Sequence, residues 1–331
     1  MWPTRPDNWR SAAFFGQQDC LALASVIAEF EPVRLAVSSE SSIEVKKRLH
    51  AGVTVVPLLF DDVWVRDTGP ITLVSENAPP VAVHWKFNSW GGLFDSTALD
   101  NEVASSIARY EDISVVRAPI VLEGGAIVTD GQGTVILTEE SVINENRNPG
   151  LTKVEAEHVL AEYLNAEHVE WLPRGLANDE AGGHVDNVCA FTSPSTLLVA
   201  VTEDRSHPSY ESLQVSGEIL RRAKNKRGQP FTVIDVPLPP YTAITEEEAR
   251  GFSAPQGGIV RLAGTPLAPS HINFYVATRA VLVPTFGCGS DKQALSIIAA
   301  AFPDRDVIPF QSREFLLGGG GIHCLTKEIP A

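Results

Sequence analysis

The 331-residue sequence has only four cysteines, and no two of them form a C-x-x-C pair. This spacing excludes a disulfide-stapled framework and a zinc ribbon. In a reducing compartment all four are expected to be free thiols, three of them buried apolar side chains and one a candidate nucleophile. They are Cys20, Cys189, Cys288 and Cys324.

Long apolar runs and an excess of positive charge are also lacking. No stretch approaches the roughly 18–20 apolar residues of a membrane-spanning helix, and the polar start MWPTRPDNWR is unlike a signal or transit peptide. Lys and Arg number 26 against 41 Asp and Glu, a net charge of −15. Such a chain is not expected to bind nucleic acid or anionic lipid, but it would attract a small cationic molecule. We therefore expect a cytoplasmic protein with a small-molecule substrate, and the sequence leaves open a homo-oligomer.

Motifs for nucleotides and for catalytic metals are missing. The glycine run Gly318–Gly321 leads into Ile322-His323-Cys324 instead of Gly-Lys-Ser/Thr, and no G-x-G-x-x-G or H-E-x-x-H occurs. This disfavours a doubly wound nucleotide-binding sheet. A metal site remains an alternative without supporting spacing, so we expect neither a metal nor an organic cofactor. Its ligands would be His184, Asp186, His323 and Cys324.

A helical pattern, by contrast, recurs five times along the chain. The third helix has the clearest signal, because Thr152 and Glu155 form a capping box ahead of apolar residues at helical spacing. The five candidate helices begin near Ser42, Ala98, Thr152, Ser209 and Asp291.

Each predicted helix is followed by one strand and then by a pair of strands. Turn residues Asp130-Gly131 and Ser193-Pro194-Ser195 predict hairpins in the second and third pairs. The single strands are expected at Val53–Leu59, Ile113–Ala118, His168–Leu172, Phe231–Val236 and Val307–Phe310. The pairs are expected within Asp61–Val74, Val121–Thr138, Gly183–Val201, Ser270–Pro284 and Phe315–Thr326.

These units fill the chain without a linker and predict one α/β domain over residues 1–331. Five ββαβ-type units arranged as a ring would bury their helices and strands against one another and leave no free sheet edges. The fourth unit carries an insertion at about 239–268, expected to be a surface loop near the site, where lids are common.

Polar residues interrupt the apolar strand pairs at similar places. They occur in Trp64–Pro70, Glu123–Gly125, Gly183–Asn187 and Gly318–Cys324, and several adjoin glycines that would let a substrate approach the backbone. If the ring closes, equivalent positions of all units point to one axis. Residues far apart in the sequence would then share a pocket.

The converging side chains favour chemistry on a cation. His184 and Asp186 would share one face of a strand, with Asp67 and Glu123 as further carboxylates and Cys324 as a thiol. Carboxylates around a thiolate repel one another unless a cation lies between them. A planar guanidinium fits, because its N–H groups pair with carboxylates and its carbon is electrophilic. The set predicts a cysteine-dependent reaction on a guanidinium.

Each of these residues alone also has an ordinary structural explanation. Cys324 could be a core thiol, His184 a turn residue, Asp67 a turn cap and Glu123 a cap for Gly124-Gly125. Only their coincidence in repeated units favours a site.

At these residues the sequence resembles the agmatine deiminases of the guanidine-modifying (pentein) superfamily, which have a five-bladed α/β propeller. The resemblance covers almost the whole chain. Its motifs are WPTRPDNWR (2–10), DDVWVRDTGP (61–70), WKFNSWGG (85–92), LEGGAIVTDGQGT (122–134), NENRNPGLTK (144–153), WLPRGL (171–176), GGHVDN (182–187), INFYV (272–276) and REFLLGGGGIHC (313–324).

The resemblance implies hydrolysis of agmatine to N-carbamoylputrescine and ammonia, a step of putrescine and polyamine synthesis, without a cofactor. Cys324 matches the nucleophile that forms an amidino-thioether, and His184 the general acid and base. Asp67 and Asp186 match the pair that grips the guanidinium. The remaining matches are Glu123, which supports the histidine, and three substrate contacts, Trp64, Trp90 and Glu180.

The chain departs from the family pattern in three places. It begins at the WPTRPDNWR motif, where the family usually has a preceding strand with a Glu-Trp-x-x-His-type stretch. Ala181-Gly182 stands where the family has Thr-Asn, and Gly321 where it has Asn.

Three alternatives to an agmatine deiminase therefore stay open. They are a deiminase of peptidyl-arginine or another guanidine, an amidinotransferase, and a non-catalytic propeller that binds a macromolecule.

Overall fold

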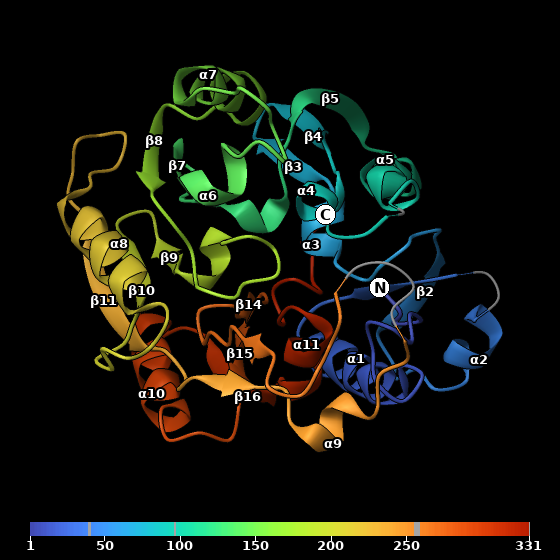
Figure 1. Ribbon diagram of the computed structural model, residues 1–331. Coiled ribbons are helices and arrows are strands. Elements are labelled where there is room, and N and C mark those ends of the chain that lie inside the picture. Colours follow the sequence, from blue (N-terminus) through green and yellow to red (C-terminus); the bar gives the residue numbers. More distant parts are fainter. Residues whose placement is uncertain (39–40, 96, 255–258, 331) are drawn as a thin grey trace.

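The computed structural model describes residues 1–38, 41–95, 97–254 and 259–330. Its elements follow one another around the molecule, with helices α5, α7, α8 and α10 at the rim (Figure 1). None of the described helices has the length and apolar character needed to cross a bilayer.

Four three-stranded sheets share one plan, in which two antiparallel strands and a helix are followed by a strand parallel to the second. This confirms the α/β class and the ββαβ order. The first two are β3 (Ile71–Ser75), β4 (Ala78–Lys86), α5 (Val103–Tyr110), β5 (Ser114–Val121), and β6 (Ile127–Thr129), β7 (Thr134–Thr138), α7 (Lys153–Leu164), β8 (His168–Leu172). The other two are β9 (Cys189–Ser193), β10 (Thr196–Val201), α8 (Tyr210–Arg222), β11 (Thr232–Pro237), and β14 (Tyr275–Val276), β15 (Ala280–Thr285), α10 (Asp291–Ala301), β16 (Asp306–Gln311).

The second strand of each sheet forms the core of its unit. In β7 all five residues are buried, and in β15 only Thr285 is not. A helix covers one face of such a strand and the middle of the molecule covers the other, so both faces are apolar. The largest apolar cluster joins the last two of these three-stranded sheets through residues such as Leu197 in β10 and Val281 in β15. Each fully buried aliphatic side chain of this kind contributes about 1.5–3 kcal/mol.

The first unit is smaller. Its sheet contains the parallel pair β1 (Val33–Val37) and β2 (Val53–Pro57), joined by the five-residue helix α2 (Ser42–Lys46), with no third strand among the described residues. The described sheets are separate from one another, so the prediction that the ring leaves no sheet edges is wrong. No single wound sheet is present either, which removes the doubly wound alternative.

Helix α1 (Phe14–Ala28), the longest described, is absent from the sequence prediction. Its N-cap Ala13 offers no side-chain hydrogen bond and has a left-handed φ of 66°, so no capping signal precedes it. Its buried residues, among them Cys20, Leu23, Ala24 and Ile27, follow helical spacing, but Phe14 and Phe15 are exposed apolar residues of the same helix, so the sequence shows no distinct polar face. Of the predicted helices, four begin within a residue of their predicted starts, and α5 begins five residues after Ala98.

Two of the predicted strand pairs are wrong. Residues 315–326 contain no strand: α11 (Arg313–Gly318) is followed by turns. The consecutive apolar residues Phe315–Leu317 fit a short buried helix as well as a strand, and Gly319 at φ 109° ends it. In 61–74 the helical turn α3 (Val65–Thr68) precedes β3, whose partner β4 lies beyond that range.

Short helical turns also open the second and third hairpin segments. They are η2 (Gly124–Ala126) and η3 (Val185–Asn187). The hairpins expected at Asp130-Gly131 and Ser193–Ser195 follow them as β6–β7 and β9–β10. The polar motifs therefore lie on turns at the ends of strands and not within strands.

The insertion at 239–268 holds three small elements and includes residues 255–258, which lie outside the described part. They are β12 (Thr242–Ala243), α9 (Glu246–Ala249) and β13 (Pro266–Leu267). The remaining short helices are η1 (Asp100–Glu102), α4 (Ser89–Gly92) and α6 (Glu139–Val142).

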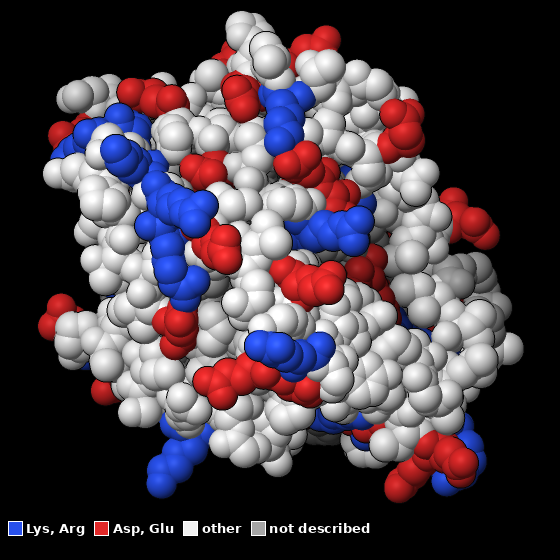
Figure 2. Space-filling view, turned by 60° about the vertical axis from the view of Figure 1, so that its left-hand side comes forward, with Lys and Arg blue, Asp and Glu red and all other residues white. Residues whose placement is uncertain are grey.

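Charged side chains of both signs are interspersed on the face that Figure 2 shows. The net charge of −15 is therefore not gathered into one acidic patch on that face.

Candidate active site

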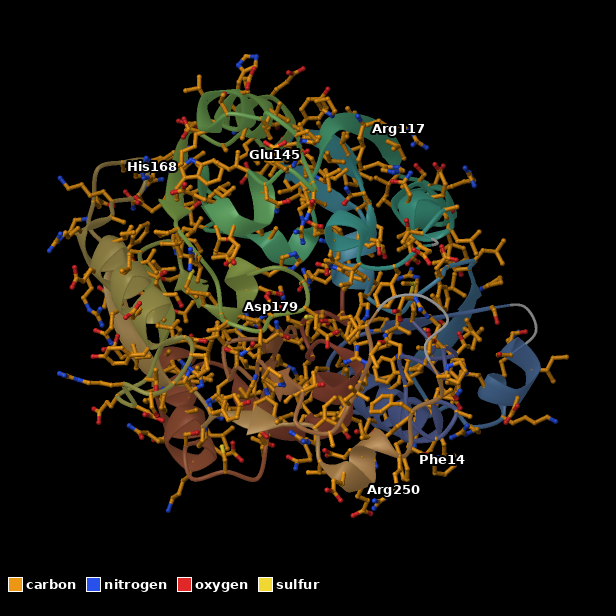
Figure 3. The ribbon with its side chains drawn as sticks, viewed as in Figure 1. Phe14, Arg117, Glu145, His168, Asp179 and Arg250 are labelled. Carbon is orange, nitrogen blue, oxygen red and sulfur yellow. The ribbon has the colours of Figure 1, made fainter. Side chains whose placement is uncertain are left out.

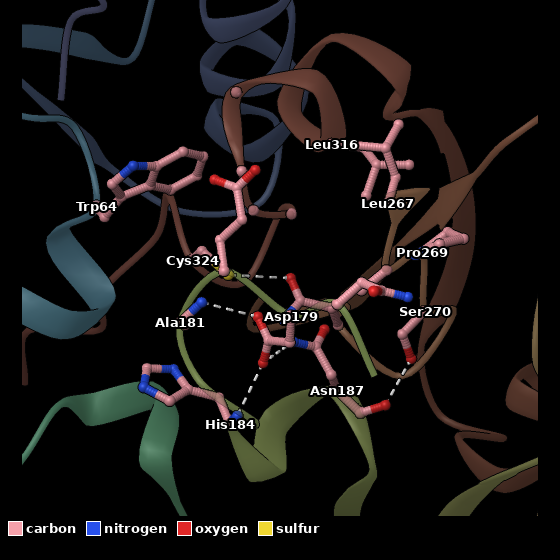
Figure 4. A pocket seen from close by; sticks show the side chains of 18 of the residues that line it. Trp64, Asp179, Ala181, His184, Asn187, Leu267, Pro269, Ser270, Leu316 and Cys324 are labelled. Carbon is pink, nitrogen blue, oxygen red and sulfur yellow. Dashed lines mark hydrogen bonds between the residues drawn. The ribbon is translucent and has the colours of Figure 1, made fainter. Parts of the chain in front are cut away.

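A pocket near the middle of the molecule collects side chains from separate units (Figure 4). Figure 3 places Asp179 toward the middle of the view, whereas Phe14, Arg117 and Arg250 lie at the periphery. The charged and aromatic residues that line the pocket are Trp64, Asp67, Trp90, Phe94, Asp179, Glu180, His184 and Phe286, with Cys324 as its thiol. Lys and Arg do not occur among the described lining residues.

Asp67 is held by donors from two other segments. It lies on α3, where its Oδ1 accepts a 2.9 Å hydrogen bond from the Gly125 N–H and its Oδ2 one from Trp90 Nε1. Burial, together with nearby Asp186 and Glu123, raises the pKa of this carboxyl. Asp67 therefore bonds other elements and does not cap its own turn.

Trp90 reaches Asp67 through an unusual backbone. Ser89 and Trp90 have left-handed φ values of 61° and 52°, and Gly91 and Gly92 continue at 86° and 90°. Such a conformation is uncommon outside glycine and occurs where tertiary contacts over-determine it. Here it directs the indole N–H to the carboxylate.

His184 lies at the N-terminal end of η3, on a turn formed by Gly182 and Gly183 at φ 76° and 81°. Its N–H donates to Asp179 Oδ2 at 2.8 Å. Its ring nitrogens lie between two carboxylates, with Nδ1 3.8 Å from Asp67 Oδ1 and Nε2 3.8 Å from Glu123 Oε2. The expected strand face shared with Asp186 is wrong, because η3 has helical geometry.

The carboxylates around His184 favour its protonated form. Burial alone would lower its pKa, but Asp67, Glu123 and Asp179 outweigh burial and raise the pKa to about 9. The imidazolium therefore predominates at neutral pH.

Glu123 lies behind the histidine and is completely buried. It does not line the pocket and does not cap η2. Its Oε1 accepts a 2.8 Å charge-assisted bond from Arg147 Nε. Burial would raise the pKa of Glu123, but Arg147 and His184 hold it below its usual range, so a carboxylate faces His184.

Asp186 is also buried and absent from the pocket lining. Its Oδ2 accepts a 2.7 Å bond from His323 Nδ1, while Oδ1 has no protein partner among the described residues. A Cβ added to Gly125 would lie 3.0 Å from Asp186 Oδ2, 2.8 Å from Asp67 Oδ1 and 2.7 Å from His184 Nδ1. The three groups thus meet at one glycine.

Cys324 follows α11 and is a half-buried free thiol that opens on the pocket. Its Sγ donates to Asn273 Oδ1 at 3.6 Å. Burial raises the pKa of this thiol well above its usual value, and Asp186 and Asp67 raise it further. Without a bound substrate, Cys324 is therefore a neutral thiol at neutral pH.

The two other expected substrate contacts, Trp64 and Glu180, also line the pocket. Trp64 stacks on Trp9 with ring centroids 5.6 Å apart, and a Cβ at Gly320 would meet its ring at 2.5 Å. Glu180 pairs with Arg261 of the insertion, with Oε1 2.6 Å from Nη1. Leu267, also from the insertion, lines the same pocket (Figure 4).

Sequence reasoning assigned no positioning role to four residues that hold the site. Asp179 orients His184, Asn273 accepts from the thiol, His323 bonds Asp186 and Arg147 bonds Glu123. Asp179 and His323 adjoin predicted site residues in the sequence, and that proximity was the available signal. Arg147 and Asn273 lie within the motifs at 144–153 and 272–276, which gave their only signal.

Two departures from the family motifs coincide with close packing. A Cβ at Gly321 would lie 2.2 Å from Asn273 Oδ1, and one at Gly182 2.9 Å from Arg147 Nη1. Both glycines therefore make room for side chains that contact site residues.

The alternative metal set His184, Asp186, His323 and Cys324 is not clustered. Among the residues the structure describes, only His271, Cys288 and Asp291 bring three such donor atoms within 4.8 Å of one another. Of the other cysteines, Cys20 and Cys189 are buried.

Comparisons with known proteins identify the family of this chain. An agmatine deiminase of Pseudomonas fluorescens is 41% identical over 337 aligned positions, covering 100% of this chain and 92% of that protein, and one of Stutzerimonas stutzeri is 40% identical with the same coverage. The solved structure of the agmatine deiminase of Enterococcus faecalis superposes with a TM-score of 0.95 at 34% identity, covering 98% of this chain and 90% of that one. Residues 1–330 match the family described as Porphyromonas-type peptidyl-arginine deiminase. The chain belongs to this family.

Proposed function

We propose that this protein is an agmatine deiminase, which hydrolyses agmatine to N-carbamoylputrescine and ammonia. One observation carries the proposal: a thiol, an imidazole and carboxylates meet in a pocket that has no Lys or Arg in its described lining. A guanidinium is the cation that this set suits, because carboxylates bind its N–H groups and the thiol can attack its carbon. Whole-length relatives that are named agmatine deiminases support the choice of substrate.

We also propose that the five units form a five-bladed propeller around this pocket. The repeated ββαβ plan of four sheets and the β1–α2–β2 unit support it. A single domain over residues 1–331 is part of the same proposal. A cytoplasmic location is proposed from the four free cysteines.

Substrate binding would generate the nucleophile. The guanidinium would lie against Asp67 and reach Asp186 Oδ1, a buried oxygen beside the pocket that has no protein partner among the described residues. It would offset the negative charge that raises the pKa of Cys324. The thiol then loses its proton to solvent, and the thiolate forms in contact with its target. Trp64 and Trp90 line the pocket and would contact the substrate. Glu180 would attract the outer, positively charged end of the substrate.

In the first half-reaction Cys324 Sγ forms a bond to the guanidinium carbon. The imidazolium of His184 donates its proton to one amino nitrogen, the C–N bond breaks and ammonia leaves. The product is an amidino-thioether on Cys324. Glu123 stabilises the imidazolium that this step requires.

In the second half-reaction neutral His184 accepts a proton from water, whose oxygen adds to the amidino carbon. The C–S bond breaks, Cys324 leaves as a thiolate, and the remaining hydroxyl proton passes to this thiolate, which restores the neutral thiol. The carbonyl of N-carbamoylputrescine results, and His184 is again protonated.

A second candidate is a deiminase of peptidyl-arginine, which the family's description favours. Its substrate needs room for a chain beyond the guanidinium. In this protein the Glu180–Arg261 pair and Leu267 occupy the outer wall of the pocket, which favours a small substrate. An amidinotransferase, in which an amine replaces water, has no supporting observation.

The test is ammonia release from agmatine, arginine, a blocked peptidyl-arginine and methylated guanidines. We expect kcat/KM to be highest for agmatine, with Cys324→Ala as the inactive control. Faster turnover of the peptide would reverse the ranking of the two candidates, and no release from any of them would reject deimination.

A further inference from the structure

A second reactive cluster lies outside the pocket lining. His271 precedes β14, while Cys288 and Asp291 lie at the start of α10. His271 Nε2 and Cys288 Sγ lie 3.0 Å and 3.1 Å from the same oxygen, Asp291 Oδ1. An imidazole nitrogen, a thiol and a carboxylate oxygen thus converge on one point.

The tautomer of His271 leaves a lone pair directed into this cluster. Its Nδ1 lies 2.8 Å from the Pro237 carbonyl oxygen, which can only accept, so Nδ1 carries the proton. In the neutral ring Nε2 is then an acceptor that faces another acceptor, Asp291 Oδ1. A cation between them converts this repulsion into attraction, and a backbone carbonyl on the far nitrogen is the usual orienting partner of a metal-bound histidine.

The backbone holds the Asp291 carboxylate in place. Its Oδ2 accepts from the N–H groups of Gly287 at 2.8 Å and Cys288 at 3.1 Å, which leaves Oδ1 for the cluster. The His271 side chain is fully buried and cannot turn toward solvent.

We propose that His271 Nε2, Cys288 Sγ and Asp291 Oδ1 bind a Zn²⁺ ion, with water as the fourth ligand. Nitrogen, sulfur and carboxylate oxygen are the ligands zinc prefers, and tetrahedral bond lengths require them to lie roughly 3.3–3.6 Å apart. The 3.0 and 3.1 Å separations need to open by only a few tenths of an ångström. Binding replaces the S–H bond of Cys288 by an S–Zn bond and releases that proton to solvent.

The ion would stabilise one wall of the pocket and would take no part in the reaction. Phe286 lines the pocket and packs on the His271 ring at 5.8 Å between centroids. Ser270, beside His271 in the chain, also lines it. A zinc ion would therefore tie the start of α10 to this wall.

The experiment uses the full chain with Cys324→Ala, so that the catalytic thiol cannot bind metal. Purified metal-free protein is titrated with Co²⁺, whose bond to a thiolate gives a near-ultraviolet charge-transfer band, and then with Zn²⁺. We expect one Co²⁺ per chain, a band that Zn²⁺ abolishes, about one proton released, and a rise in Tm with Zn²⁺.

Adding Cys288→Ser should abolish the band, and adding His271→Gln should weaken metal binding by at least about tenfold. Cys20→Ser and His158→Gln are the matched controls and should leave both unchanged. The serine keeps a hydroxyl toward Asp291, so the variant is expected to fold, which circular dichroism checks. The proposal would be overturned if the band were absent in the parent protein. It would also be overturned if the two cluster variants bound zinc as tightly as the parent protein does.

Discussion

The acids around Cys324 keep its thiol neutral. Burial raises the pKa of this thiol and Asp186 and Asp67 raise it further, while its Sγ donates to the side-chain oxygen of Asn273. We expect such a thiol to react slowly with general oxidants and alkylating agents until a cationic substrate enters the pocket. Reactivity and substrate recognition are therefore coupled at this residue.

The covalent intermediate can be observed directly. Mass spectrometry of a reaction quenched in acid should find an amidino adduct on the peptide that contains Cys324. Cys20 and Cys189 are buried and Cys288 lies outside the pocket lining, so they should stay unmodified. An adduct on one of these three with Cys324 free would reject the assignment.

The two acids proposed to bind the guanidinium can be tested by Asp67→Asn and Asp186→Asn. Each keeps the shape of the side chain and removes one charge from a buried site, which costs roughly 2–5 kcal/mol. We expect kcat/KM to fall at least about tenfold in each variant.

The control for these variants is Glu246→Gln in the exposed first turn of α9, which should change kcat/KM little. Urea unfolding on the same preparations separates activity from stability. A less stable but fully active Asp67→Asn protein would show that this carboxylate only joins Gly125 and Trp90.

The charge of His184 makes stability depend on pH in a defined direction. The pKa of His184 is about 9 in the folded protein against an ordinary value of 6.5, so its contribution to stability is complete below pH 6.5 and is lost as pH rises through 9. The difference in Tm between the wild type and His184→Gln should therefore shrink from pH 6 to pH 10. A constant difference would mean that the histidine is not charged in the folded state.

At the scale of elements, the site residues lie on short helical turns and not on strands. Asp67 lies on α3, His184 and Asp186 on the turn of η3, and η2 supplies the Gly125 N–H. A turn of three or four residues can direct neighbouring side chains and a backbone N–H toward one point. A strand would send adjacent residues to opposite faces.

The close approach at η2 is testable by Gly125→Ala. The new Cβ would lie 2.7 Å from His184 Nδ1 and 2.8 Å from Asp67 Oδ1, so the site must open. We expect kcat/KM to fall at least about tenfold with a loss of about 1–3 kcal/mol in unfolding free energy. Gly289→Ala is the control, because nothing lies within 4 Å of its Cβ. Equal activity of both variants would contradict the crowded geometry.

At the scale of the whole molecule, the arrangement of units separates the proposed chemistry from the proposed zinc site. The reaction needs groups of the central pocket, whereas His271, Cys288 and Asp291 lie behind one part of its wall. Exhaustive chelation should therefore leave kcat/KM unchanged well below the unfolding temperature, while lowering Tm. Activity that disappears on chelation and returns with zinc would make the metal part of the reaction.

The sequence by itself determined the local elements that carry strong signals. The Thr152–Glu155 capping box is present at the start of α7, and the turn residues before β7 and β10 join antiparallel strands. These features depend on neighbours within a few residues, which the sequence displays directly. Helix α1 has no such cap and was not predictable from its pattern.

Only the tertiary structure decided which groups share the pocket and in what state they are. The protonated form of His184 depends on Asp67 and Glu123 from other units, and the neutral form of Cys324 on burial and two distant acids. The motifs contain most of the reactive residues, and also Arg147 and Asn273, but they do not show that Arg147 bonds Glu123 or that Asn273 accepts from Cys324. Charge states and hydrogen bonds depend on distance in space, and distance in space is set by how the units pack.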